Sequence, residues 1–323
     1  MGMRVINPGI LSLLQDAGRY GKHGVGLTTG GPLDPVAFKW ANRLVDNDLT
    51  ATAIEISIGG FKAELTEKMN IAVTGAKAII KVNGKPMPQW QTLQLNKSDV
   101  IEVAYASQGC RIYLAVSGGF DIKPQFGSTS TVVREAIGGV NGKPIEAGMS
   151  LPTAAKSVQN QAGQGQLYKV PQFYRPEYSQ NITLRVIPGY QIQHFSRHQQ
   201  RMFFYHEYEI SDLADRMGYR LKGPKVKCDI EGILSEGICL GAIQVPADGQ
   251  PIILMNDRQT IGGYPKIGSV LSLDLAKLSQ LTQGAKVCFE PITIDHAHNL
   301  LHLAQHQFEH AKLAPVEPYN DPS

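Results

Sequence analysis

Short apolar runs separated by glycine, proline and polar residues dominate the pattern along the chain. The continuous apolar run at 251–255 (PIILM) predicts a buried strand, and the run at 70–74 predicts another. Two segments instead place apolar residues at helical spacing. One begins at Asp34-Pro35, an N-cap followed by a first-turn proline, and the other covers 294–313. The pattern predicts a mainly β protein with a few short helices and a C-terminal helix.

Similar short segments recur in the same order in the two halves of the chain. Residues 3–9 (MRVINPG) are similar to 184–189 (LRVIPG), and in each half a later apolar run leads to Gly-Gly and an aromatic residue. Two matches in the same order favour two related β-rich halves over chance similarity. A polar, glutamine-rich stretch lies between them. We expect an N-terminal domain over 1–151, a linker over 152–181, and a C-terminal domain over 182–323 that includes the final helix.

Composition and charge exclude several classes of protein. The chain has 323 residues, of which 42% are hydrophobic and 18% charged, so a globular fold is expected. The net charge is only +3 and no block of Lys and Arg occurs, which argues against nucleic acid as a partner. No apolar run approaches the roughly 20 residues of a membrane span, and no signal peptide is recognisable. We therefore expect a cytoplasmic protein.

The cysteines predict neither disulfides nor zinc. Four are present and widely separated, and no CxxC or Cys/His pair with zinc spacing occurs. Three of the four lie in apolar, strand-like runs, so we expect reduced core thiols. Several histidines of the segment 294–313 have i, i+4 spacing, but without an acidic HExxH pattern a solvated helix face is the favoured interpretation over a metal site. No metal or cofactor site is recognisable.

A polar segment at 256–266 directly follows the predicted strand 251–255, and polar loops at strand ends are common functional sites. One interpretation of Asp257 and Arg258 is a turn with an exposed charge pair. The functional interpretation, which we favour, is that Arg258 binds a carboxylate or amide and Asp257 accepts a proton.

The end of the same segment supplies further candidates. Gly262 and Gly263 would expose main-chain N–H groups to a developing oxyanion, with Tyr264 beside them. Lys266 is either a surface lysine or an anion contact.

A second polar constellation lies near the N-terminus. Asp16 and Arg19 are close in sequence and precede a glycine-rich stretch that ends at Asp34. The structural interpretation is a local ion pair and a helix cap. The functional interpretation is an anion-binding cluster of main-chain amides at the start of the helix. The glycine spacing does not match a dinucleotide-binding fingerprint, and the chain has no GxSxG or Walker A motif.

Glu55 alternates with Ile54 and Ile56 and therefore points to the opposite face of a strand. Such a residue usually faces solvent. In a two-sheet or barrel fold the opposite face can instead line an interior, where the carboxylate needs a partner such as Arg19 or Arg258.

With these residues in view, the chain closely resembles the biotin-dependent carboxyltransferase family, which includes allophanate hydrolase subunit 2, the KipI antagonist KipA and the C-type component of 5-oxoprolinase. The resemblance covers nearly the whole length and rests on several segments in the family's order, among them LLQDAGRYGKHGVGLTTGGPLDP, AIEISIGG, YLAVSGGFD, DRMGYRLKGP and ILSEGICLGAIQVPADGQPIILMNDRQTIGGYPKIGS. Two departures are visible. Residues 127–131 read GSTST where the family often has an arginine, and Tyr190 stands where the family often has proline.

The resemblance implies two cyclophilin-like β-barrel domains and a subunit of a larger assembly. The implied function is a 5-oxoprolinase subunit that helps an ATP-using complex convert 5-oxoproline to glutamate, with KipI-like and LamB/YcsF-like partners. A KipA-like regulator of a sensor-kinase inhibitor is a second interpretation. A carboxyltransferase subunit is a third; it needs a separate biotin carrier, because the chain has no biotinyl-lysine motif. A homo-oligomer is a further option.

These implications combine with the residues in one hypothesis. A small cyclic or planar amide binds between the two domains, where Arg258 and Arg19 hold a carboxylate and Asp257 or Glu55 handles a proton.

Overall fold

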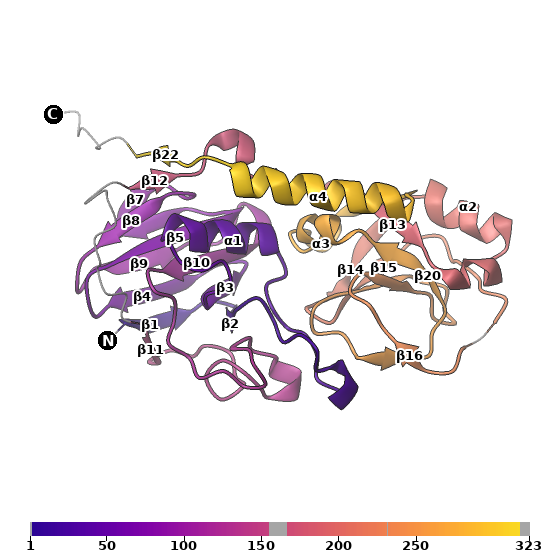
Figure 1. Cartoon of the computed structure of the whole chain (residues 1–323), viewed down its shortest axis with the longest axis horizontal. Coiled ribbons are helices and arrows are strands. Elements are labelled where there is room, and N and C mark those ends of the chain that lie inside the picture. Colours follow the sequence, from indigo (N-terminus) through magenta and orange to yellow (C-terminus); the bar gives the residue numbers. More distant parts are fainter. Residues whose placement is uncertain (1, 155–166, 231, 317–323) are drawn as a thin grey trace. The chain divides into compact units, whose positions relative to one another are not determined.

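The computed structural model describes residues 2–154, 167–230 and 232–316. These residues divide into two compact units (Figure 1). Unit 1 comprises 2–18, 35–154, 167–177 and 311–316, and unit 2 comprises 19–34 and the described residues of 178–310. The chain is mainly β, as predicted.

Unit 1 is built from two sheets. The larger has the strand order β11 (Ser150–Pro152), β1 (Gly2–Pro8), β4 (Phe61–Leu65), β9 (Val100–Val103), β6 (Ile80–Val82) and β7 (Lys85–Met87). The smaller has the order β2 (Leu11–Gln15), β3 (Ala53–Ser57), β10 (Gln108–Val116), β5 (Met69–Lys77) and β8 (Thr92–Leu95). Apolar residues from both sheets form one buried cluster. In this unit the strands form two packed layers.

Helix α1 (Pro35–Leu44) contacts β5 and β10 of the smaller sheet (Figure 1). It begins at Pro35, as the sequence predicts. The Thr74 hydroxyl of β5 donates to the Ala37 carbonyl at 2.7 Å, and the ring of Phe38 meets Tyr113 of β10 edge to face at 6.0 Å. The sheet face that would otherwise be exposed to water is therefore covered beneath α1.

Unit 2 contains a closed seven-stranded barrel. Its strand order is β13 (Asn181–Pro188), β20 (Lys266–Val270), β17 (Ala242–Gln244), β18 (Ile252–Leu254), β15 (Gly218–Lys222), β14 (Tyr208–Ala214) and β21 (Lys286–Pro291). Only β13 and β21 pair in parallel; the other pairs are antiparallel. Ile243, Ile253 and Ile267 fill the interior, with no side-chain exposure. Closure leaves no unpaired strand edge in this sheet.

Three helices belong to unit 2: α2 (Arg197–Tyr205), α3 (Ser272–Leu278) and α4 (Ile294–His310). The last confirms the predicted C-terminal helix. Ser196 caps α2, because its hydroxyl accepts from the Gln199 N–H at 3.3 Å. Four short 3-10 segments, η1 (His23–Val25), η2 (Val133–Glu135), η3 (Gln172–Tyr174) and η4 (Tyr190–His194), complete the helical structure of the described residues.

The segment 152–181 is only in part a connection between units. Residues 155–166 lie outside the described residues, whereas 167–177 belong to unit 1. There β12 (Tyr168–Lys169) pairs with β22 (Ala314–Pro315), and Val170 is fully buried. Residues 19–34 also leave the N-terminal half and lie in unit 2. The units therefore exchange segments, which a single boundary in sequence does not describe.

Candidate functional site

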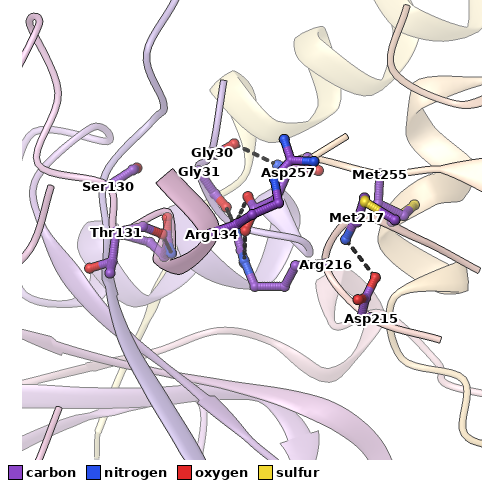
Figure 2. Close-up of polar contacts among 12 residues, drawn as sticks. Gly30, Gly31, Ser130, Thr131, Arg134, Asp215, Arg216, Met217, Met255 and Asp257 are labelled. Atoms are coloured by element: carbon purple, nitrogen blue, oxygen red, sulfur yellow. Dashed lines mark hydrogen bonds and ion pairs between the residues drawn. The ribbon is translucent and has the colours of Figure 1, made fainter. Parts of the chain in front are cut away.

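The segment after β18 is anchored by a buried ion pair rather than by an exposed charge pair. Arg216 donates from Nε and Nη2 to the two carboxylate oxygens of Asp257, both at 2.9 Å, and from Nη2 to the Gly31 carbonyl at 2.8 Å (Figure 2). Both side chains are buried. Each carboxylate oxygen of Asp257 therefore has a charged partner, which suits a structural role. The interpretation of Asp257 and Arg258 as an exposed turn pair is wrong.

Arg258 is also buried and contacts the main chain. Its Nε donates to the Ile238 carbonyl at 3.1 Å, and its Nη1 donates to the Met255 carbonyl at 3.3 Å. Burial lowers the pKa of Arg258 from its usual value. This guanidinium joins the segment 256–266 to the neighbouring segment around Ile238.

The two glycines of this segment are required by close packing. Neither Gly262 nor Gly263 has a positive φ. A Cβ on Gly262 would lie 2.6 Å from Ile238 Cδ1, and a Cβ on Gly263 would lie 3.0 Å from the Ile233 carbonyl oxygen. Gly262 belongs to β19 (Ile261–Gly262), which pairs with β16 (Glu236–Gly237). The segment is thus held against β16 as a small ribbon, and Glu236 lies directly opposite Gly262.

Next to this ribbon, unit 2 has a cavity of about 330 Å³. This is at the lower end of the roughly 300–1,000 Å³ typical of small-molecule sites. Polar side chains contribute much of the lining, namely Tyr190, Gln191, Glu236, Cys239, Lys266 and Ser269. They come from η4, β16, the turn after it and β20. Of the predicted site residues, Lys266 lines this cavity.

The polar residues of the cavity form one hydrogen-bonded cluster around Glu236. The Lys266 ammonium and the Tyr190 hydroxyl both bind its carboxylate. Gln191 donates from Nε2 to Glu236 Oε1 at 3.0 Å and accepts at Oε1 from the Lys266 N–H at 2.8 Å. Gln191 therefore fixes the carboxylate of Glu236 relative to the main chain of β20.

These contacts set the charge states within the cluster. The hydrogen bond from Lys266, together with that from Tyr190, lowers the pKa of Glu236 below its ordinary 4.5. The hydrogen bond to Glu236 raises the pKa of Tyr190 above 10. At neutral pH the cluster therefore presents a carboxylate, which only accepts hydrogen bonds, and a neutral phenol.

Cys239 corrects the prediction of core thiols. Its side chain is exposed and lines the cavity, with its Sγ 3.1 Å from Ser269 Oγ. Of the others, Cys110 is buried, and Cys228 and Cys288 are partly buried. All four are free of disulfides, as expected.

Asp16 organises a loop of unit 1. Its carboxylate accepts from the Ser128 and Ser130 hydroxyls, each at 2.6 Å, from the Thr129 N–H at 2.7 Å and from the Gly18 N–H at 2.9 Å. Burial opposes ionisation, but these four hydrogen bonds outweigh it and lower the pKa of Asp16 below 3.8. The GSTST segment of this chain therefore binds an internal carboxylate.

Glu55 is buried, not solvated. It lies on β3 with an exposed fraction of 1%, and its Oε2 accepts from the Tyr113 hydroxyl at 2.7 Å. Glu55 pairs across the sheet with Tyr113, which pairs in turn with Thr74, so all three lie on the face that α1 covers. The interior interpretation of Glu55 is confirmed, with Tyr113 as a partner.

The remaining candidates lie in unit 2. Arg19 is fully buried, and its N–H donates to the Thr29 carbonyl at 2.6 Å. Asp34 is buried and accepts from the Tyr178 hydroxyl at 2.7 Å and from Gln280 Nε2 at 2.8 Å. Burial raises the pKa of Tyr178 well above 10, so this phenol stays a donor. Tyr264 is half exposed.

Sequence reasoning missed Arg216, Glu236, Tyr190 and Gln191. Arg216 and Glu236 stand in the DRMGYRLKGP and ILSEGICLGA segments. Glu236 is a charged residue two positions before a predicted core cysteine, and this was the available signal. Tyr190 was visible only as a departure from the family pattern.

Within the described residues, no group of three or more His, Cys, Asp or Glu side chains is placed to hold a metal ion. No helix in the same part of the chain is long and apolar enough to cross a membrane.

Comparison with known proteins agrees with the fold and its motifs. A family model for the carboxyltransferase domain, subdomain A and B, matches residues 25–291. The chain is 33% identical to the C-type component of the 5-oxoprolinase of Escherichia coli K12, over 95% of its own length and 96% of that protein. It is 34% identical to the corresponding 5-oxoprolinase component of Haemophilus influenzae, with coverage of 89% and 90%.

Among solved structures, the urea amidolyase of Kluyveromyces lactis matches with a TM-score of 0.90 and 26% identity. The match covers 99% of this chain but only 21% of the amidolyase, so the chain spans about a fifth of that protein. The family model, the full-length relatives and the structural match agree, and the chain therefore belongs to the carboxyltransferase domain family, subdomain A and B.

Proposed function

We propose that this chain is the C-type component of a multi-subunit 5-oxoprolinase. One observation supports this most directly: the two relatives that carry this name match along nearly their whole length. The urea amidolyase of Lachancea kluyveri, at 30% identity, matches over only 17% of its own length. A chain that is equivalent to the whole of one relative is more simply its counterpart than a fragment of the other.

The proposed reaction is the opening of a lactam. Water adds to the carbonyl carbon of 5-oxoproline, the C–N bond breaks, and the nitrogen leaves as the protonated amine of glutamate. The amide bond resists this because of its resonance, so the carbonyl must be activated and the nitrogen protonated. ATP hydrolysis to ADP and phosphate supplies the driving force. Because this chain has no recognisable ATP-binding loop, we assign ATP to a partner.

The partners proposed are a KipI-like and a LamB/YcsF-like protein, and the compartment proposed is the cytoplasm. Four free cysteines are compatible with a reducing compartment. Of the predicted site residues, Lys266 is the one we place in contact with the substrate. Asp257 and Arg258 hold the segment that ends at Lys266.

Mixing the three purified proteins tests the function. We expect ATP-dependent release of glutamate from 5-oxoproline only when all three are present. Arg258→Ala should reduce activity by loosening the segment, whereas Arg220→Ala, which removes one partner of an exposed ion pair, should leave it unchanged. Full activity without this chain would rule out the proposal.

A carboxyltransferase role is the second candidate, because the family model and the amidolyase structure both match this domain. It requires a carboxybiotin donor on another protein. Affinity capture of the tagged chain, followed by a streptavidin blot, would support this candidate if a biotinylated protein is enriched. A blot without such a band favours the 5-oxoprolinase.

A further inference from the structure

The cavity of unit 2 holds an ion pair that a ligand can reach. The Lys266 side chain is 10% exposed and that of Glu236 is 32% exposed, and both line the cavity. By contrast, the Asp257–Arg216 pair has side-chain exposures of 11% and 8%. The two charges at the cavity are therefore buried enough to interact strongly and still open on one side.

Each half of the pair selects a different ligand group. The Glu236 carboxylate retains acceptor capacity toward the cavity and matches an N–H donor. The Lys266 ammonium has three donors, of which one binds Glu236 and one more is sufficient for an anion. A ligand with only one of these groups would weaken the internal ion pair without replacing it, at a cost in free energy.

The surrounding hydrogen bonds fix where the ligand would lie. Gln191 binds both the Glu236 carboxylate and the Lys266 main chain, and the Tyr190 hydroxyl occupies Glu236 Oε2. The carboxylate is thus held on two sides. A planar ligand can present its N–H to Glu236 and its anionic group to Lys266 at once, because the two charged groups are adjacent.

We infer that the unit 2 cavity binds a compact ligand carrying an amide N–H and a carboxylate, with Glu236 accepting from the N–H and Lys266 binding the carboxylate. This inference rests on the proposed function, because 5-oxoproline has both groups on one five-membered ring. It adds the residues that recognise each group and the polarity with which the ring enters. Arg258 and Arg19, which were expected to hold the carboxylate, are not needed for it.

Ligand-observed NMR titration of the full chain tests the assignment group by group. Three probes have the same ring size: 5-oxoproline, 2-pyrrolidinone, which lacks the carboxylate, and cyclopentanecarboxylate, which lacks the N–H. We expect Lys266→Met to weaken 5-oxoproline by about tenfold, the factor given by about 1.4 kcal/mol, while the affinity for 2-pyrrolidinone stays within about twofold. Glu236→Gln should weaken both lactams by about tenfold and spare cyclopentanecarboxylate.

The exposed pair Lys222–Asp212 in the same unit provides matched controls. Its side chains are both 60% exposed, so Lys222→Met and Asp212→Asn make the same charge changes away from the cavity. Both should leave every affinity unchanged. Circular dichroism melting curves of all variants would confirm that they are folded.

The same variants in the three-protein mixture separate the inference from the proposed function. Activity that requires this chain, with the KM for 5-oxoproline unchanged in Lys266→Met and Glu236→Gln, would refute the cavity assignment and leave the function standing. An inactive mixture would refute the function, while the affinities of the isolated chain still decide the cavity. Equal weakening of all three probes, or no binding of 5-oxoproline with an inactive mixture, would overturn the assignment.

Discussion

Two ion pairs of unit 2 are joined by the same segment and differ in their access to solvent. Asp257–Arg216 is buried and bidentate, with an additional bond from Arg216 to the Gly31 carbonyl. Glu236–Lys266 lies at the far end of the segment, borders the cavity and leaves Glu236 a third exposed. Both have the same chemistry of carboxylate and cation. Their surroundings give the first a structural role and the second a ligand-binding role.

The difference shows why charged residues in a loop are weak evidence of a site. Asp257 and Arg258 drew attention because they are charged and follow a buried strand, but burial has already satisfied them with protein partners. Glu236 stands in a two-residue strand and is less conspicuous in sequence. Access to a cavity distinguishes a carboxylate that can bind a ligand from one that holds the fold.

Breaking the buried pair should have the largest effect. Asp257→Ala leaves the Arg216 charge buried without its carboxylate and should lower the free energy of unfolding by about 3–5 kcal/mol. Denaturant unfolding followed by circular dichroism measures this loss. Tryptophan fluorescence alone is unsuitable, because both tryptophans, Trp40 and Trp90, lie in unit 1.

Two further variants frame that result. Asp212→Ala, which breaks the exposed pair with Lys222, should cost less than about 1 kcal/mol. The double change Arg216→Met with Asp257→Leu should recover much of the loss, because no buried charge remains. If Asp257→Ala costs no more than Asp212→Ala, the structural role of the buried pair is wrong.

The ribbon that joins the two pairs should show an intermediate effect. Gly262→Ala would place a Cβ 2.6 Å from Ile238 Cδ1 and should cost about 1–3 kcal/mol through overpacking. Gly237→Ala is the matched control in the opposing strand, where nothing lies within 4 Å of the added Cβ, and should change stability by less than about 0.5 kcal/mol. Thermal unfolding of both variants checks the prediction, and equal shifts would contradict the packing explanation.

The accessible pair should give the smallest effect on stability and a clear effect on titration. Lys266 lowers the pKa of Glu236 below 4.5, so Lys266→Met should raise this pKa toward the ordinary value, whereas Lys222→Met should not. Carboxyl-carbon NMR measures both. Because the pKa of Glu236 is lower in the folded chain, this carboxylate stabilises the fold above its unfolded pKa and loses that contribution as pH falls through the folded pKa. Lys266→Met should flatten that acid dependence; an unaltered titration would mean that the pair does not form in solution.

The regular elements were largely predictable from local pattern. The apolar run at 251–255 is β18, the Asp34-Pro35 signal marks the start of α1, and helical spacing locates α4. The units themselves were less accessible, because 19–34 lie in unit 2 and 167–177 in unit 1. Such exchanges depend on packing between residues far apart in sequence, and no local pattern records them.

The candidate site divides along the same line. Lys266 was predicted from its position after a glycine pair, and it does line the cavity. Glu55 was left open between solvent and interior, and the burial that decides it comes from α1 covering its sheet face. Tyr190, Gln191 and Glu236 were missed because they come from η4 and β16, which are more than 40 residues apart in sequence.

The sequence by itself determined the mainly β fold, the family and the segment 256–266 as a region of interest. Those depend on periodicity, on turn residues and on motifs that are contiguous in the chain. Only the tertiary structure decided which charges of that region are available to a ligand. Asp257 meets Arg216 across 41 residues and Lys266 meets Glu236 across 30. Pairing and burial at such separations follow from how the barrel closes, and they set the free energy of each charge.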